Sequence, residues 1–289
     1  MKEETENQKM NGMLVFQSDF GLSDGAVAAM YGVALCVDEN LRIYNLTHDI
    51  PPFDTFEASY RLLQAVPFWP AGTIFVSVVD PGVGSQRRCI VAKSAKGQFI
   101  VTPDNGTLSH IARAIGIESA RIIREDIGRR EGSQWSATFH GRDIFAYSAA
   151  LLAGGKVTYD EIGEAVDPSQ LVMMEGMYPE FTEGEIRGTI ETLDVRFGSL
   201  WTNISSEFFE KLHVLPGEDV DVSVYKGKTR VYHSFVPFGK TFSDVEVGEP
   251  LLYVNSMHHI GVAINQGNFA RAYNIGTRDP WRVVFRKKN

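Results

Sequence analysis

An aspartate and an arginine seven residues apart are the first candidates for chemistry in this sequence. The apolar, β-branched run 73–79 stops abruptly at Asp80, and Arg87 follows a turn of proline and glycines. A run that is apolar on both faces predicts a strand buried in a parallel sheet. Because ligands bind outside the carboxyl ends of such strands, we expect Asp80 to face a ligand and the loop to bring Arg87 beside it. The alternative is a turn aspartate followed by solvated arginines.

Two further residues stand where an expected strand or helix begins or ends. Asp19 follows the expected strand 13–17, and a carboxylate there can accept hydrogen bonds from both hydroxyls of a ribose. His140 lies at the entrance of an expected helix that runs to Leu152. The structural alternatives are a turn or cap aspartate and a buried histidine without a reaction to perform. The loop after the first strand lacks the Gly-x-Gly-x-x-Gly pattern, so a dinucleotide is not indicated.

The elements that must position these residues fall into two regions. Strands alternate with helices in the first region, which predicts an α/β domain with a central, mostly parallel sheet over residues 13–165. Proline and glycine near acidic residues indicate a linker over 166–184. Short strands separated by turns predict a smaller, mostly β, barrel-like domain over 185–289. The expected strands are 13–17, 41–46, 73–79, 89–92, 99–102, 120–124, 186–195, 200–203, 220–224, 230–235, 251–254 and 260–264. The expected helices are 26–37, 55–66, 107–115, 205–212 and one that opens within 136–143 and runs to Leu152.

Composition and charge exclude several classes of partner. The 289 residues are 44% hydrophobic and 22% charged, as in a globular protein, and the net charge is -8. An acidic chain with only short basic clusters is not expected to bind nucleic acid or an anionic membrane. Cys36 and Cys89 lie in apolar stretches without metal-ligand spacing, so we expect two reduced core thiols and no metal. No apolar run spans a membrane and residues 1–12 lack a signal-peptide core, which predicts a cytoplasmic protein.

Six motifs in order give the sequence a resemblance to a known family. They are DFGLSDG (19–25), VVDPGVGSQRR (78–88), TPDNG (102–106), FHGRDIFA (139–146), LDVRFGSLWTNI (193–204) and LYVNSMHHIGVAINQGN (252–268). Together they resemble the S-adenosylmethionine (SAM) hydroxide adenosyltransferases, which are related to the SAM-dependent fluorinase and chlorinase. The resemblance implies that water attacks the ribose C5′ of SAM and yields adenosine and L-methionine, with no cofactor beyond SAM as substrate. It also implies a homotrimer with SAM bound between subunits.

The resemblance assigns roles to individual residues. The Asp–Arg–His triad of the family matches Asp80, Arg87 and His140, and the halogenating relatives lack this triad. Either Asp80 or His140 would accept the proton of water, and Arg87 would orient the carboxylate. The implied substrate contacts are Asp19 for the ribose diol, Asp24 in the adjoining loop, Phe53 near the ribose, Asp194 and Ser256 for the methionine end, Phe197 and Trp201 on either side of adenine, Ser199 at an adenine contact, and Asn265 and Gln266 at the adenine edge.

Some of these positions depart from the family or have a structural alternative. Ser199 stands where the family usually has asparagine, and 257–259 replaces a smaller run after Ser256. Phe197 and Trp201 are expected on one strand face, where they could instead belong to the barrel core. The neighbouring His258 and His259 would point to opposite faces of a strand and cannot readily share a metal ion.

Two other functions compete with hydrolysis. One is a halogenase-like enzyme that uses another nucleophile, against which Asp80 and His140 argue. The other is a protein that binds SAM or adenosine without turnover, in which a complete polar triad would have no task.

Overall fold

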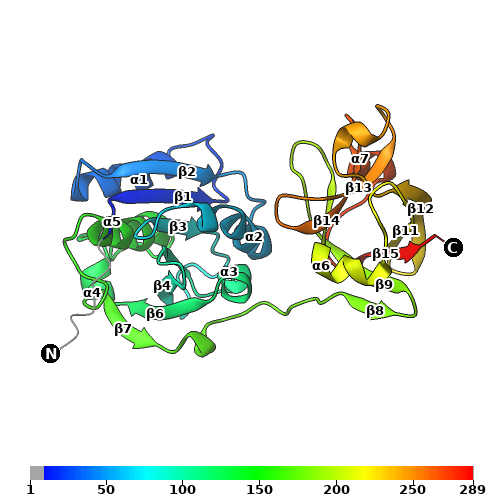
Figure 1. Ribbon diagram of the computed structural model, residues 1–289. Helices are drawn as coiled ribbons and strands as arrows, with labels where there is room; N and C mark the ends of the chain where they lie inside the picture. Colours follow the sequence, from blue (N-terminus) through cyan, green and yellow to red (C-terminus); the bar gives the residue numbers. More distant parts are fainter. Residues whose placement is uncertain (1–9, 289) are drawn as a thin grey trace. The chain divides into compact units, whose positions relative to one another are not determined.

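The computed structural model describes residues 10–288, which divide into two compact units between Met174 and Glu175 (Figure 1). This boundary falls inside the expected 166–184 linker. Each unit has its own sheet and its own hydrophobic core.

The first unit contains a seven-stranded mixed sheet in the order β2-β1-β3-β5-β4-β6-β7 (Figure 1, blue to green). The four strands from β2 to β5 in this order run parallel, and the remaining three pair antiparallel. The parallel half therefore provides one edge at which several strands end together. The strands are β1 (Met13–Ser18), β2 (Arg42–Thr47), β3 (Ile74–Val78), β4 (Cys89–Ser94), β5 (Phe99–Pro103), β6 (Ile117–Ile123) and β7 (Gly163–Val166).

Helices cover both faces of this sheet because its buried strands are apolar on both sides. Leu14 and Phe16 of β1 face the core formed with α1 and α5, whereas Val15 faces the core formed with α2 and α3. The α/β class expected from the sequence is confirmed. The helices are α1 (Ala26–Val37), α2 (Thr55–Ala65), α3 (Ser109–Ala114), α4 (Glu125–Gly128) and α5 (Tyr147–Ala153), with 3-10 turns η1 (Val66–Phe68) and η3 (Pro168–Gln170) and a π-helix η2 (Gly141–Ala146).

The second unit is a nearly closed antiparallel barrel in the order β12-β11-β15-β9-β10-β14-β13, with β8 paired to β9 (Figure 1). A bridge between Phe238 and Leu252 links the two ends of this order. The barrel-like fold expected from the sequence is thus confirmed. Its elements are β8 (Glu180–Thr182), β9 (Glu185–Leu193), β10 (Leu200–Ser205), β11 (Asp219–Lys226), β12 (Thr229–Pro237), β13 (Pro250–Val254), β14 (His259–Ile264), β15 (Trp281–Lys287), α6 (Ser206–Phe209), η4 (Glu210–Leu212), η5 (Phe242–Asp244) and α7 (Phe269–Tyr273).

The structure corrects several expectations. Cys89 is buried but Cys36 is exposed, so the two cysteines are not both core thiols. The expected linker contains η3 and the strand β8. The helix expected to open within 136–143 begins at Gly141, next to His140, and its first part is a π-helix. Strand β15 and helix α7 were not predicted. Among residues 10–288 there is no helix both long enough and apolar enough to cross a membrane.

Candidate active site

The carboxyl edge of the parallel strands gathers the first group of candidate residues. Strands β1 and β3 are neighbours in register, with Ser18 opposite Val78. Asp19 follows the first strand directly, and Asp80 lies two residues beyond the second. The loop after β5 lies at the same edge, since Asn105 Nδ2 donates a 2.9 Å hydrogen bond to the carbonyl of Val79, the residue before Asp80. This is the edge at which ligands bind in open α/β sheets.

Asp80 and Arg87 form a buried ion pair at this edge. Arg87 Nε lies 2.9 Å from both carboxylate oxygens, and Arg87 Nη2 also bonds Asp80 Oδ2. The two side chains are only 6% and 9% exposed. Arg88 points to the other face and bonds Asp104, with 2.7 Å between Nε and Oδ2. The predicted approach of Arg87 to Asp80 is therefore confirmed, and the alternative of solvated arginines is wrong.

His140 contacts the same guanidinium from a different part of the chain. Its Nδ1 lies 2.9 Å from Arg87 Nη2. The next residue, Gly141, packs so closely on the end of β3 that a Cβ there would lie 3.0 Å from Val78 Cγ1. A π-helix begins at this glycine, and such turns are frequent at functional sites. The close approach brings His140 against the loop that carries Asp80 and Arg87.

The surroundings of His140 favour its neutral form. Burial lowers the pKa of the imidazole below the usual value of 6.5, and the positive charges of Arg87 and Arg129 lower it further, while Glu125 and Asp80 oppose the shift in part. The His140 Nε2 atom is buried and has no hydrogen-bond partner among the described residues. The site therefore contains a neutral imidazole with one ring nitrogen still available.

Cys89 is a neighbour of this cluster that the sequence reasoning missed. Arg87 Nη1 donates a 2.8 Å hydrogen bond to Cys89 Sγ, and the guanidinium carbon lies 5.2 Å from the centre of the Phe145 ring. Burial raises the pKa of the thiol, against the lowering effect of Arg87. The available signal was spacing, because residues two apart at the start of a strand point to the same face.

The remaining candidates of the first unit are tied to local backbone. Asp19 Oδ2 accepts a 2.9 Å hydrogen bond from the Phe53 amide, which holds Phe53 at a positive φ of 68° with its ring exposed. Asp24 is exposed, and its Oδ1 accepts a 2.9 Å hydrogen bond from Ala26 at the start of α1. The structure thus joins Asp19 to Phe53 and gives Asp24 a place at the entrance of a helix.

In the second unit, Asp194 organises the turn between β9 and β10. Its Oδ1 accepts hydrogen bonds from the amides of Arg196 and Phe197 at 3.0 and 3.1 Å. Phe197 therefore lies in this turn with its side chain 69% exposed, whereas Trp201 is buried in β10. The prediction that the two rings share one strand face is wrong, because the turn ends only where Leu200 starts the strand.

Tyr253 connects two of the predicted nucleobase residues and was also missed. Trp201 Nε1 donates a 3.0 Å hydrogen bond to its hydroxyl, which also bonds the Ser199 side chain. Burial raises the pKa of Tyr253, so the hydroxyl stays protonated near neutral pH. An aromatic residue three positions before Ser256, in a motif already singled out, was the available signal.

The last group lies in the turns around β14. Ser256 is exposed in a turn that Asn255 holds by accepting hydrogen bonds from the amides of Met257 and His259. Asn265 Nδ2 donates to the Val245 carbonyl at 2.9 Å, so this side chain is committed to the backbone. Gln266 follows with a positive φ of 55°.

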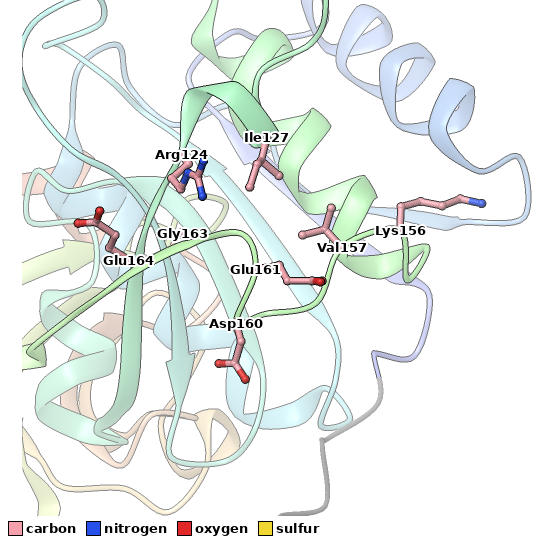
Figure 2. Close-up of a pocket in the computed structure, with 8 residues that line it drawn as sticks. All are labelled: Arg124, Ile127, Lys156, Val157, Asp160, Glu161, Gly163 and Glu164. Atoms are coloured by element: carbon pink, nitrogen blue, oxygen red, sulfur yellow. The ribbon is translucent and has the colours of Figure 1, made fainter.

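A hollow of about 570 Å³ lies elsewhere in the first unit (Figure 2). Charged groups of both signs line it, and several are already bonded, as in the pairs of Arg124 with Asp126 and of Asp160 with Arg121. None of the predicted site residues belongs to it, and we assign it no function. Within residues 10–288 no three His, Cys, Asp or Glu side chains are grouped to hold a metal ion. The lining residues are Arg124, Ile127, Lys156, Val157, Asp160, Glu161, Gly163 and Glu164.

Comparison with known proteins identifies the family of this chain. Residues 14–163 match the SAM hydroxide adenosyltransferase N-terminal domain, and residues 188–282 match the corresponding C-terminal domain. The chain belongs to the SAM hydroxide adenosyltransferase family. This membership confirms the resemblance carried by the six motifs.

Individual members and relatives of this family align over most of the chain. The (R)-S-adenosyl-L-methionine hydrolase of Salinispora tropica is 36% identical over 93% of this chain and 96% of its own. The enzyme of the same name from Thermus thermophilus is 34% identical over 93% and 98%. A fluorinase of Actinopolyspora mzabensis is 25% identical over 91% and 94%. A crystal structure of an uncharacterized conserved protein from Thermotoga maritima has a TM-score of 0.86 at 30% identity, covering 95% of this chain and all of that one.

Proposed function

We propose that this protein hydrolyses SAM to adenosine and L-methionine. The observation that carries the proposal is the hydrogen-bonded cluster of Asp80, Arg87 and His140 at the carboxyl edge of the sheet. It occurs in a chain 36% identical to an (R)-S-adenosyl-L-methionine hydrolase. In the reaction, the water oxygen forms a bond to ribose C5′, the C5′–S bond breaks, and sulfur leaves with the bonding pair as a neutral thioether. One proton of the water is released.

The step that needs catalysis is mainly the activation of the nucleophile, water. A sulfonium leaves readily without a general acid, whereas water is a weak nucleophile. A positioned acceptor for its proton contributes about 10² to 10⁴ in rate, and alignment behind C5′ contributes more. Asp80 and His140 are the two side chains with acceptor atoms in the cluster, and the guanidinium of Arg87 bonds both of them.

The predicted substrate contacts complete the proposal. In the first unit, Asp19 would bind the ribose diol, with Phe53 and Asp24 beside it. In the second unit, Asp194 and Ser256 would hold the methionine end, and Phe197, Ser199, Trp201, Asn265 and Gln266 would surround adenine, whose flat faces suit aromatic walls. We further propose the homotrimer that the resemblance implies, with each SAM bound by two subunits; light scattering of the purified protein tests the subunit number.

A halogenase is the second candidate, because a fluorinase is among the relatives. In that reaction a halide ion would replace water behind C5′. The carboxylate of Asp80 would repel such an anion at short range. The proposal therefore favours water.

The first test is to incubate the purified protein with SAM and to measure adenosine and methionine by chromatography. We expect both products in equal amounts in a buffer without halide. Product formation that requires chloride or fluoride would favour the halogenase, and binding of SAM without products would favour a non-catalytic protein.

The second test uses two substitutions in the cluster. Arg87→Ala and His140→Ala should each lower kcat about 10²-fold or more, since each removes a group that positions or activates water. SAM binding, measured by calorimetry, should persist. Arg88→Ala is the matched control, because this neighbouring arginine bonds Asp104 instead and should leave kcat within a few-fold. Full activity in both cluster variants would remove the cluster from the mechanism.

A further inference from the structure

The contact between Arg87 and His140 determines which imidazole nitrogen carries the proton. A guanidinium has only N–H donors and no acceptor. Since Arg87 Nη2 lies 2.9 Å from His140 Nδ1, the Nδ1 atom must be the acceptor of this hydrogen bond. A neutral imidazole that accepts at Nδ1 carries its proton on Nε2.

The Nε2–H group that results has no partner among the described residues. His140 is only 5% exposed, and Nε2 itself is buried. A buried donor without an acceptor is unfavourable, and such groups in native proteins call for an explanation. An oxygen atom bound at this position during the reaction would supply the missing acceptor.

We propose that His140 acts on the attacking water as a hydrogen-bond donor through Nε2, and that Asp80, not His140, takes the proton of that water. This inference rests on the proposed hydrolase function and decides between the two acceptors named there. His140 has no free lone pair in the ring, because Nδ1 is used by Arg87 and Nε2 is protonated. The imidazole therefore holds the oxygen in place and leaves its own proton where it is.

Asp80 retains the capacity for this step. A carboxylate offers about four acceptor positions. Arg87 contacts at most three of them, through one Nε–H shared between both oxygens and one Nη2–H, which leaves at least one position free. As the C5′–O bond forms and the C5′–S bond breaks, the oxygen becomes a strongly acidic oxonium. A weakly basic carboxylate is then sufficient to take the proton, and the sulfur keeps the electron pair.

Acid should displace the imidazole, because protonation of Nδ1 removes the acceptor that binds Arg87. Protonation at Nδ1 would set two N–H groups against each other. The charged groups around the ring are Arg87 and Arg129, which oppose its protonation, and Asp80 and Glu125, which favour it. Burial and the two arginines prevail and lower the pKa of His140, so activity should fall only below the usual histidine value of 6.5.

The direct test is nitrogen-15 NMR of the histidine rings in the full-length protein. The signals of His140 are identified as those missing from His140→Gln. We expect a protonated Nε2 and an unprotonated Nδ1 at neutral pH. A protonated Nδ1 with a free lone pair on Nε2 would overturn the proposal, and this readout does not depend on activity.

The kinetic test compares His140→Gln with His140→Ala. A glutamine amide can accept from Arg87 through Oε1 and donate through Nε2, but it does not titrate. We expect glutamine to keep kcat within about ten-fold of the wild type and to remove the loss of activity in acid that protonation of His140 causes, while alanine loses the 10² or more that an orienting group contributes. Equal losses in both variants would contradict the proposal. His110→Gln, another buried histidine of the same unit, serves as the control and should keep the loss of activity in acid.

The outcomes separate this inference from the proposed function. A wild-type protein that forms no adenosine from SAM disproves the hydrolase whatever the tautomer. If the wild type is active but its His140 is protonated on Nδ1, the hydrolase function stands and the donor role is disproved. The same conclusion holds if the wild type is active and His140→Gln is inactive.

Discussion

Arg87 makes nearly all the hydrogen bonds that a guanidinium can make. Of its five N–H groups, Nε–H and one Nη2–H reach Asp80, the other Nη2–H reaches His140, and one Nη1–H reaches Cys89. Burial lowers its pKa, but the interactions with Asp80 and Cys89 together prevail and raise the pKa of Arg87. Such an arginine orients its neighbours and is itself held in one position.

The thiol of Cys89 is the contact that can be removed without touching the proposed reacting groups. Cys89→Ala should lower kcat roughly five-fold, in line with the loss of one ordinary hydrogen bond of about 1 kcal/mol. Cys89→Ser, which retains an acceptor, should recover most of the activity. Cys36→Ala is the control, because this cysteine is exposed. Unchanged kinetics in Cys89→Ala would mean that the thiol does not hold the guanidinium.

At the scale of elements, the position of His140 depends on how the π-helix is anchored. Asp143, in its first turn, is fully buried and bonds the guanidinium groups of Arg142 and Arg130. Burial raises the pKa of this carboxyl, but the hydrogen bonds and charges of the two arginines prevail and lower it. The ionised form is therefore the one that fastens the loop 130–139 to the helix.

Replacing this anchor should destabilise the first unit. Asp143→Asn should lower the free energy of unfolding by about 1–3 kcal/mol at neutral pH, the range for hydrogen bonds to charged groups, since both arginines are partly exposed. A carboxyl with a lowered pKa stabilises above its unfolded value of 3.8 and loses this effect as the pH falls below it. Thermal melts of both proteins should therefore converge in acid. Asp160→Asn, at a largely exposed ion pair, should change stability by less than about 1 kcal/mol.

Local sequence patterns predicted most of these elements but not all of their partners. The run 26–37 folds as the expected helix, and the 73–79 run contains β3. Strand β15 was missed although its sequence carries a strand pattern, with Trp281, Val283 and Phe285 buried and Arg282 and Arg286 on the other face. The pairings of β3 with β5 and of β4 with β6 join segments far apart in sequence, which local periodicity does not encode.

The candidate site was predictable to a similar extent. The loop length and the turn after Asp80 predicted its contact with Arg87, and the helix entrance singled out His140. The thiol of Cys89 was interpreted as core because apolar neighbours surround it in the sequence. Phe197 was assigned to a strand because spacing does not reveal that Asp194 caps a turn there.

At the scale of the whole molecule, the two units divide the predicted substrate contacts between them. The residues proposed for chemistry and for the ribose belong to the first unit, and those proposed for adenine and methionine belong to the second. Each core is apolar and has its own sheet. The connection between them contains backbone without regular structure over 172–179.

Limited proteolysis tests this division. We expect the first cuts within 175–179 and two fragments that stay folded by circular dichroism, because neither core is interrupted there. Each purified fragment alone should form no adenosine from SAM. Early cuts inside either sheet would contradict the division into two units. Adenosine formation by one isolated fragment would contradict the distribution of the substrate contacts over both units.

The ion pair of Arg87 and Asp80 also bears on whether SAM can alkylate the protein. A sulfonium alkylates any accessible nucleophile, and a naked carboxylate close to C5′ would be esterified by the adenosyl group. The guanidinium occupies most of the acceptor positions of Asp80, which makes this carboxylate a weaker nucleophile toward carbon. Under the proposed function, the contact that directs the carboxylate toward water also disfavours esterification of Asp80 by the adenosyl group.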